Sequence, residues 1–254
     1  LDNLGGDDFD FEAALSNQAV SILASDRFTN EGLVFSESGE EGAKVIKLAG
    51  VDNFELSSDR AGDLLFVLDT PALMGNPSDT PEMISEKTSL RNSLIENIGQ
   101  LDNLLELNKV LGDEADSTKL KVALNNIASL DSLTKVSIDL KYDDEKLNQV
   151  YTTLADPALD AESKSRIVSE YESLTKLFID KPKRLQSVFD NPDKLTLLDE
   201  LTKSLSAEKG QINLLFNNLE YAEDIRLIAN RFEGTKRDII LSDILDLSRA
   251  NPVQ

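Results

Sequence analysis

The chain has 254 residues, 47 of them acidic and 26 basic, and its formal net charge is -21 at pH 7. It contains no His, Cys or Trp, which excludes imidazole and thiolate ligands, disulfides and every nucleophilic pair that needs His or Cys. A charge of this size repels phosphate groups, so binding to nucleic acid or to an anionic membrane is not expected.

The chain begins with a cluster of acidic residues, in which Asp7, Asp8 and Asp10 follow the pair Gly5-Gly6. Calcium prefers hard oxygen ligands, and this order partly matches the calcium-binding nonapeptide pattern G-G-x-G-x-D. The single copy is imperfect, because Asp8 stands where the pattern has Gly. Asp7, Asp8 and Asp10 are therefore candidate Ca²⁺ ligands, with a solvated acidic tail as the alternative. No other cofactor is predicted.

Short apolar runs follow, each bounded by Gly, Asp, Asn or Ser, a pattern typical of β-strands. The five runs are residues 19–24, 33–35, 45–49, 54–56 and 64–68. Val20 in the first run and Val45 in the third lie 25 residues apart, and each of these two runs leads to a Phe, as successive rungs of a parallel β-helix would. An antiparallel sandwich of five strands accounts for the same runs, and two copies do not decide between the two architectures.

The segment from Val20 to Phe35, VSILASDRFTNEGLVF, resembles a rung of the filamentous-haemagglutinin type of secreted bacterial protein. Repeats of that family alternate short strands with Asn-x-Gly turns along a β-helix, and Asn30-Glu31-Gly32 has this form. The resemblance covers only the N-terminal part of the chain. It implies that the chain is a piece of a giant, acidic surface or secreted protein that serves as a scaffold and binding surface, and it transfers no catalytic residue.

The charge and the apolar pattern both change near residue 80. Residues 1–87 hold 18 acidic and 5 basic side chains, whereas residues 88–254 hold 29 and 21. A loop rich in Pro, Gly, Asn and Ser separates the two parts at residues 71–80. We predict an α+β protein with a small β region over residues 1–75 and an all-helical bundle or short α-solenoid of six to eight helices over residues 80–254.

Helical spacing begins after this loop. Apolar residues three or four apart, which indicate one helix face, are Leu90, Leu94, Ile98, Leu101 and Leu105. Residues able to cap a helix N-terminus are Thr80, Asp160, Asn191, Ser206 and Thr235. The acidic triplet Asp143-Asp144-Glu145 is also expected to open a helix, where negative charge favours the helix dipole.

Similar segments recur within the helical part. NIGQLDNL at residues 97–104 resembles NIASLDSL at residues 126–133, an offset of 29, and VFDNP at 188–192 is loosely similar to LFNNL at 215–219, an offset of 27. Stacked helix pairs would explain both similarities. Acidic amphipathic helices also look alike by chance, so the sequence leaves both explanations open.

Three Leu-Thr-Lys triplets occur, at residues 133–135, 174–176 and 201–203. The first two belong to Ser-x-x-Lys motifs, a spacing at which Lys activates Ser in one class of acyl-transferring hydrolases. That class also needs Lys-Thr-Gly and Ser-Asp-Asn elements, which are missing, so ordinary amphipathic helices are the favoured interpretation. Paired carboxylates could hydrolyse glycosides without His, and this is the weakest alternative.

The apolar residues predicted for the helical core are Leu94, Ile98, Leu101, Leu124, Ile127, Leu130, Phe189, Phe216, Leu219, Ile228, Ile240 and Ile244. No apolar run is longer than residues 64–68, far below the roughly 20 residues of a membrane span, so membrane insertion is not expected.

These features together predict a structural or adhesive module of a bacterial surface or secreted protein, not an enzyme, that acts through a protein partner or self-association. The extracellular or cell-surface location follows from the resemblance. The alternative is a cytoplasmic or phage-derived assembly protein that oligomerises through its helical face. A carboxylate-based hydrolase is the third hypothesis.

Overall fold

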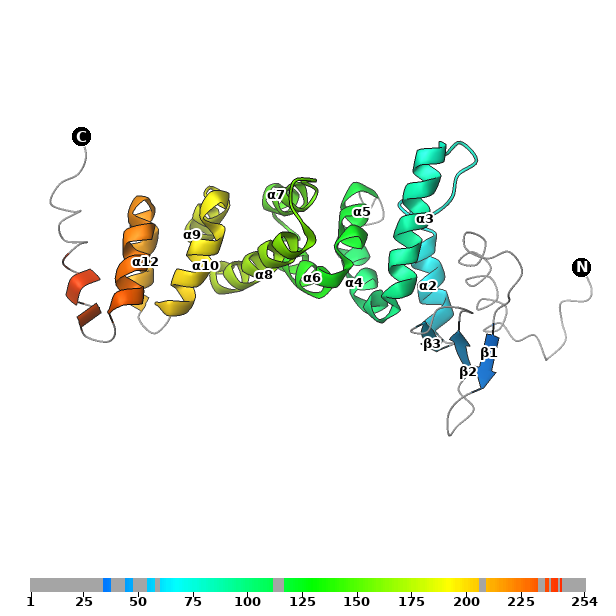
Figure 1. The fold of residues 1–254 in the computed structure, drawn as a ribbon, viewed down its shortest axis with the longest axis horizontal. Coiled ribbons are helices and arrows are strands. Elements are labelled where there is room, and N and C mark those ends of the chain that lie inside the picture. Colours follow the sequence, from blue (N-terminus) through cyan, green and yellow to red (C-terminus); the bar gives the residue numbers. More distant parts are fainter. Residues whose placement is uncertain are drawn as a thin grey trace, which may run out of the picture.

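The computed structural model describes residues 34–37, 44–47, 54–57, 60–111, 117–205, 209–232, 236–237, 239–241 and 243. In this part of the chain, an antiparallel sheet stands at one end of a long row of helices (Figure 1).

The sheet has three strands in the order β1 (Val34–Glu37), β2 (Lys44–Lys47) and β3 (Glu55–Ser57). Ile46 in the middle strand pairs with Phe35 on one side and with Leu56 on the other. Both connections are shorter than the roughly dozen residues that a parallel crossover needs, so hairpins form. These strands therefore do not have the parallel arrangement of β-helix rungs.

The prediction of a strand at residues 64–68 is wrong. This apolar run is part of helix α2 (Ala61–Leu68). Its buried residues include Ala61, Leu64, Leu65 and Leu68, which have the spacing of one helix face. A short apolar run has no period of its own that separates a strand from a buried helix. The domain boundary near residues 75–80 stays a prediction, although α2 precedes it and packs on α4.

Ten α-helices lie between residues 81 and 231, rather than six to eight. They are α3 (Pro81–Glu96), α4 (Leu101–Leu111), α5 (Ser117–Asn125), α6 (Leu130–Asp139), α7 (Asp144–Leu154), α8 (Ala161–Phe178), α9 (Pro182–Phe189), α10 (Leu195–Ser204), α11 (Lys209–Asn217) and α12 (Ala222–Arg231). Short 3₁₀ helices join four of the helix pairs: η2 (Ile98–Gln100), η3 (Ile127–Ser129), η4 (Pro192–Lys194) and η5 (Leu219–Tyr221).

The helices form two rows along the long axis (Figure 1). In one row, α2, α4, α6, α8, α10 and α12 each pack on the next even-numbered helix. In the other row, α3 packs on α5, the Gln149 side chain of α7 donates to the Phe189 carbonyl of α9, and Arg184 of α9 donates to Asn213 of α11. The described helices therefore stack as successive pairs, in which packing is mainly between neighbours.

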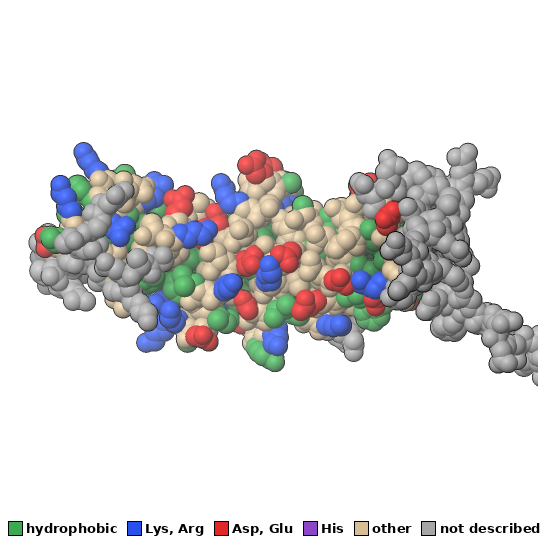
Figure 2. Space-filling model, turned by 90° about the horizontal axis from the view of Figure 1, so that it is seen from below, with side chains coloured by type: hydrophobic (Ala, Val, Ile, Leu, Met, Phe, Trp, Pro, Cys, Tyr) green, Lys and Arg blue, Asp and Glu red, His purple; other side chains and the backbone are tan. Residues whose placement is uncertain are grey.

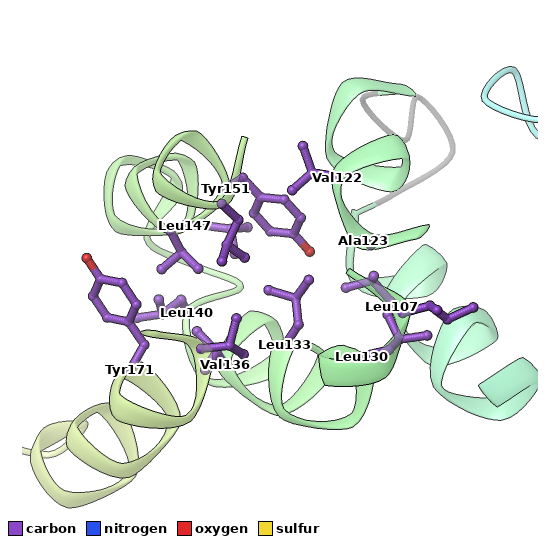
Figure 3. Packing of buried hydrophobic residues seen from close by; sticks show 14 of the residues in the cluster. Leu107, Val122, Ala123, Leu130, Leu133, Val136, Leu140, Leu147, Tyr151 and Tyr171 are labelled. Atoms are coloured by element: carbon purple, nitrogen blue, oxygen red, sulfur yellow. The ribbon is translucent and has the colours of Figure 1, made fainter. Parts of the chain in front are cut away.

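One hydrophobic cluster extends through the described residues from Phe54 to Leu241. Seven of the predicted core residues are buried: Leu94, Ile98, Leu101, Leu124, Ile127, Leu130 and Phe189. Four others, Phe216, Leu219, Ile228 and Ile240, are only partly buried, because they lie towards the end of the array, where the stack has fewer neighbours. Ile244 lies outside the described residues. Figure 3 shows the centre of the cluster, where Leu133 and Val136 of α6 face Tyr151 of α7.

Three predicted helix starts are confirmed. The side chain of Thr80 accepts a hydrogen bond from the Met83 amide and begins α3, and Asp160 accepts one from the Ser163 amide and begins α8. Asp143 does the same for α7, so the acidic triplet opens that helix. Each cap satisfies one of the backbone N–H groups that a helix start leaves free. Ser206 and Thr235 lie outside the described residues.

The apolar residues from Leu90 to Leu105, which were expected to line one helix, are divided between α3 and α4, because the helix is interrupted at Asn97. An asparagine occupies the same place in four junctions: Asn97, Asn126, Asn191 and Asn218. In the first three, the side-chain Nδ2 donates to the carbonyl four residues earlier, at 2.7–2.9 Å. Asn191 precedes η4, but its side chain bonds back to α9 and does not make the N-cap hydrogen bond that was predicted. The segments at offsets 29 and 27 occupy equivalent helix junctions.

The Asn126 junction makes a direct prediction. Asn126→Ala removes the bond to the Val122 carbonyl and is expected to lower the free energy of unfolding by about 1 kcal/mol. Asn126→Asp turns a donor into a carboxylate that faces this carbonyl at a negative helix end, and is expected to cost about 2 kcal/mol. Urea unfolding measures both. Asn148→Asp, at an exposed position of α7, is the control, and an equal loss there contradicts the role of Asn126.

Candidate functional site

The three Leu-Thr-Lys triplets lie on α6, α8 and α10 and share one burial pattern. In each triplet the Leu and Thr are buried, and the Lys is exposed. An acidic residue precedes each Lys by four positions, giving the pairs Asp131/Lys135, Glu172/Lys176 and Asp199/Lys203. We call the exposed side of α6, α8 and α10 that carries the three lysines the even-helix face; of the three acids, Asp131 is exposed and Asp199 is buried.

Lys135 does not activate Ser132, as the Ser-x-x-Lys motif would require. Its ammonium donates to the Asp131 carboxylate at 2.5 Å and lies 3.5 Å from Glu172 of the next even helix. The bond to Asp131 raises the pKa of Lys135, and the charge of Glu172 adds to this effect. Lys135 therefore stays a cation between two acids.

Polar contacts also connect each even-numbered helix to the next. These contacts are Arg60–Asp102 between the start of α2 and α4, Thr134 to the Asn103 carbonyl (3.3 Å), Lys135–Glu172 (3.5 Å), Thr196 to Glu170 (3.1 Å), and Arg226–Glu200 (3.9 Å). Exposed ion pairs contribute little stability each, so this row of contacts is better understood as setting register between helices. Figure 2, seen from the side of the even-numbered helices, shows acidic and basic side chains interspersed along this surface.

A cavity of about 280 Å³ opens on the even-helix face between α6 and α8. It is lined by Lys135, Ile138, Asp139, Glu172 and Lys176. Neither Asp139 nor Lys176 has a hydrogen bond or ion pair with any residue that the structure describes. The cavity thus offers one carboxylate, one ammonium group and the apolar side of Ile138 to a ligand.

Partial burial raises the pKa of the Asp139 carboxyl group. The nearby charge of Glu172 raises it further, and Lys176 opposes the shift. A cation brought by a ligand would stabilise the ionised form of Asp139. The cavity is therefore suited to a positively charged group at Asp139 and to a negatively charged group at Lys176.

A second cavity, of about 360 Å³, lies between the loop after α2 and the start of α3. Its lining includes Asp79, Ile84, Lys87 and Arg91. The Lys87 ammonium lies 2.7 Å from the Asp79 carboxylate, and these side chains are only 8% and 4% exposed. This hydrogen bond is the main cause that lowers the pKa of Asp79. Lys87 also donates to the Met74 carbonyl, and Arg91 donates to the Leu73 carbonyl.

The rest of the lining of this second cavity is mixed, with Asn76 and Thr88 beside the apolar Ile84 and Pro77. Ile84 is exposed. The polar groups at its base are engaged in holding the loop after α2 in place. We therefore assign this cavity first to the structure of the loop.

The candidate calcium ligands Asp7, Asp8 and Asp10 lie outside the described residues, so the calcium site stays a prediction. In the described part of the chain, His, Cys, Asp and Glu side chains form no group of three or more that could hold a metal ion. Among the same residues, every helix is too short or too polar to cross a bilayer.

The described residues thus define an elongated array of stacked helix pairs with a charged face along one row. Comparisons with protein-family models, with curated proteins and with solved structures found no match to this chain.

The cavity residues Asp139 and Lys176 were not among the predicted site residues. The signal that could have found Lys176 was the repeated Leu-Thr-Lys triplet, which the sequence shows three times. Nothing in the sequence distinguishes Asp139 from the other acidic residues, because its role depends on the packing of α6 against α8.

Proposed function

We propose that the protein is a non-enzymatic scaffold that binds a protein partner along the even-helix face. The observation that carries this proposal is the recurrence of a lysine with an acidic residue four positions before it on three successive even-numbered helices, α6, α8 and α10. Stacked helix pairs build extended surfaces on which a partner segment can lie. A surface of alternating charge selects a partner by the order of its charges more than by buried area.

The partner that fits the α6–α8 cavity is a polypeptide segment with a basic and an acidic side chain close together. Its basic group would pair with Asp139, its acidic group with Lys176, and its apolar stem would lie against Ile138. Asp139 and Lys176 act on each other only through their charges, so binding would not have to break a hydrogen-bonded ion pair there.

The hydrolase alternative has less support. Asp139 and Glu172 line the same cavity, but Glu172 already lies beside Lys135. None of the five lining residues is aromatic, whereas sugar sites usually stack a ring against the substrate. The proposed location at a bacterial surface or outside the cell rests on the resemblance of residues 20–35, and only Val34 and Phe35 of that segment are described.

Photo-crosslinking tests the proposal. Benzoylphenylalanine is placed at the exposed position 169 of α8, two helix turns before Lys176, or, as a control, at the exposed position 152 of α7, and the protein is irradiated in an extract of its source organism. We expect a defined protein adduct at position 169 in at least several-fold excess over position 152. Asp139→Lys should abolish it, because the substitution puts a cation where the partner's cation would bind.

The same irradiation of the purified chain alone separates two kinds of partner. An adduct of twice the chain mass that Asp139→Lys removes identifies a second copy, as expected for an assembly protein. Equal adduct yields at positions 169 and 152, or a yield that Asp139→Lys leaves unchanged, contradict binding at this face.

A further inference from the structure

Two acidic side chains are buried where α8 packs on α10. The side chains of Glu170 on α8 and Asp199 on α10 are 6% and 9% exposed. Thr196, one helix turn before Asp199, donates to Glu170 Oε2 at 3.1 Å, so this side of α10 faces Glu170. Carboxylates this well buried are uncommon unless other groups compensate their charge.

The compensation at this joint is incomplete. Asp199 Oδ2 lies 2.6 Å from the Lys203 ammonium, but Asp199 Oδ1 is buried and has no hydrogen-bond partner in the described structure. Arg166, on the helix of Glu170, lies 3.8 Å from Glu170 Oε1. Arg166 and Lys203 are both more than 60% exposed, so water weakens their pull on the two acids.

We propose that Glu170 and Asp199 form a proton-sharing pair that tightens the α8–α10 joint when the surroundings become mildly acidic. A proton taken from solvent by Glu170 turns this carboxylate into a donor, and the orphan Oδ1 of Asp199, one helix turn after the Thr196 that contacts Glu170, is its acceptor. One proton then removes the repulsion between two buried charges and satisfies a buried oxygen.

The surroundings of Glu170 also favour its protonated form. Burial, the largest effect, and the charge of Asp199 raise the pKa of Glu170. The Thr196 hydrogen bond and the charges of Arg166 and Lys203 lower it, and the net result is a raised pKa. The neighbouring titratable group is Tyr171, whose pKa is raised by burial. Because the folded pKa of Glu170 exceeds the unfolded value, the folded state binds more protons between those two values, and stability increases as the pH falls through this range.

Thermal unfolding of three proteins between pH 7.5 and 5.0 tests the proposal. Gln at position 170 carries a permanent donor and no charge, so Glu170→Gln is expected to raise Tm by roughly 2–4 °C at pH 7.5. This gain should shrink as the pH falls, because the wild type then takes up the proton on Glu170. Glu106→Gln, at an exposed position of α4, removes the same charge and should keep a constant offset from the wild type.

Carbon-13 NMR of the Glu170 carboxyl group gives a second readout that does not depend on the stability of the variant Glu170→Gln. Thr196→Val removes a donor that lowers the Glu170 pKa, so the titration midpoint should move to higher pH than in the wild type. A Glu170 midpoint at or below the ordinary glutamate value of about 4.3 overturns the proposal. So does a Tm offset of Glu170→Gln that stays constant across the pH range.

Discussion

Phe178→Ala is expected to lower the free energy of unfolding by about 3–5 kcal/mol, as measured by urea denaturation. Phe178 is the last residue of α8 and is fully buried. Its ring meets Phe216 of α11 edge to face, with the ring centroids 4.8 Å apart. The truncation therefore removes buried apolar surface, leaves a cavity and breaks the aromatic contact between α8 and α11.

Leu177→Ala is the matched control for this substitution. Leu177 precedes Phe178 on the same helix but is 40% exposed, so its truncation is expected to cost less than about 1 kcal/mol. If both substitutions cost the same, the orientation of the end of α8 is wrong, because Phe178 is buried and Leu177 points towards solvent, about 100° away around the helix.

Leu133→Ala is expected to cost about 2–5 kcal/mol in the same measurement. Leu133 is fully buried on α6, and Figure 3 places it between Leu130, Val136 and Tyr151. Since α6 packs on both α4 and α8, a loss at this position weakens the contact between the two halves of the array. Leu227→Ala, at an exposed position of α12, should cost less than about 0.5 kcal/mol.

The slope of the urea transition gives Leu133→Ala a second test. If the described array unfolds as one unit, the slope stays at the wild-type value, because the same surface is exposed in one step. A clearly smaller slope would show that the halves on either side of α6 unfold separately, as the nearest-neighbour packing of stacked repeats permits.

Much of the helical part could be predicted because its signals are local. Thr80, Asp143 and Asp160 cap helices by accepting from amides three residues away, and the 3–4 residue spacing of apolar residues is set within one helix. The similarity of the segments at residues 97–104 and 126–133 was visible in the sequence, and the structure shows its cause, because in both an Asn follows one helix and leads into a 3₁₀ helix.

Other features depend on contacts between distant residues. The apolar runs at 54–56 and 64–68 look alike, yet the first contributes to a strand and the second to a helix. Strand β3 exists by pairing with β2, whereas α2 is held by packing on α4. No local property of a three- to five-residue run records which neighbour it will meet.

The candidate site divides in the same way. The sequence by itself determined the helical character of the chain after residue 80, several helix boundaries and the spacing of the acid–lysine pairs. Each of these depends on residues within one or two turns of a single helix. Only the tertiary structure decided that α6, α8 and α10 lie in one row, which brings Lys135 to Glu172, places Asp139 and Lys176 in one cavity, and buries Glu170 with Asp199. Those juxtapositions join residues from different helices, and their distances follow from side-chain packing across the stack.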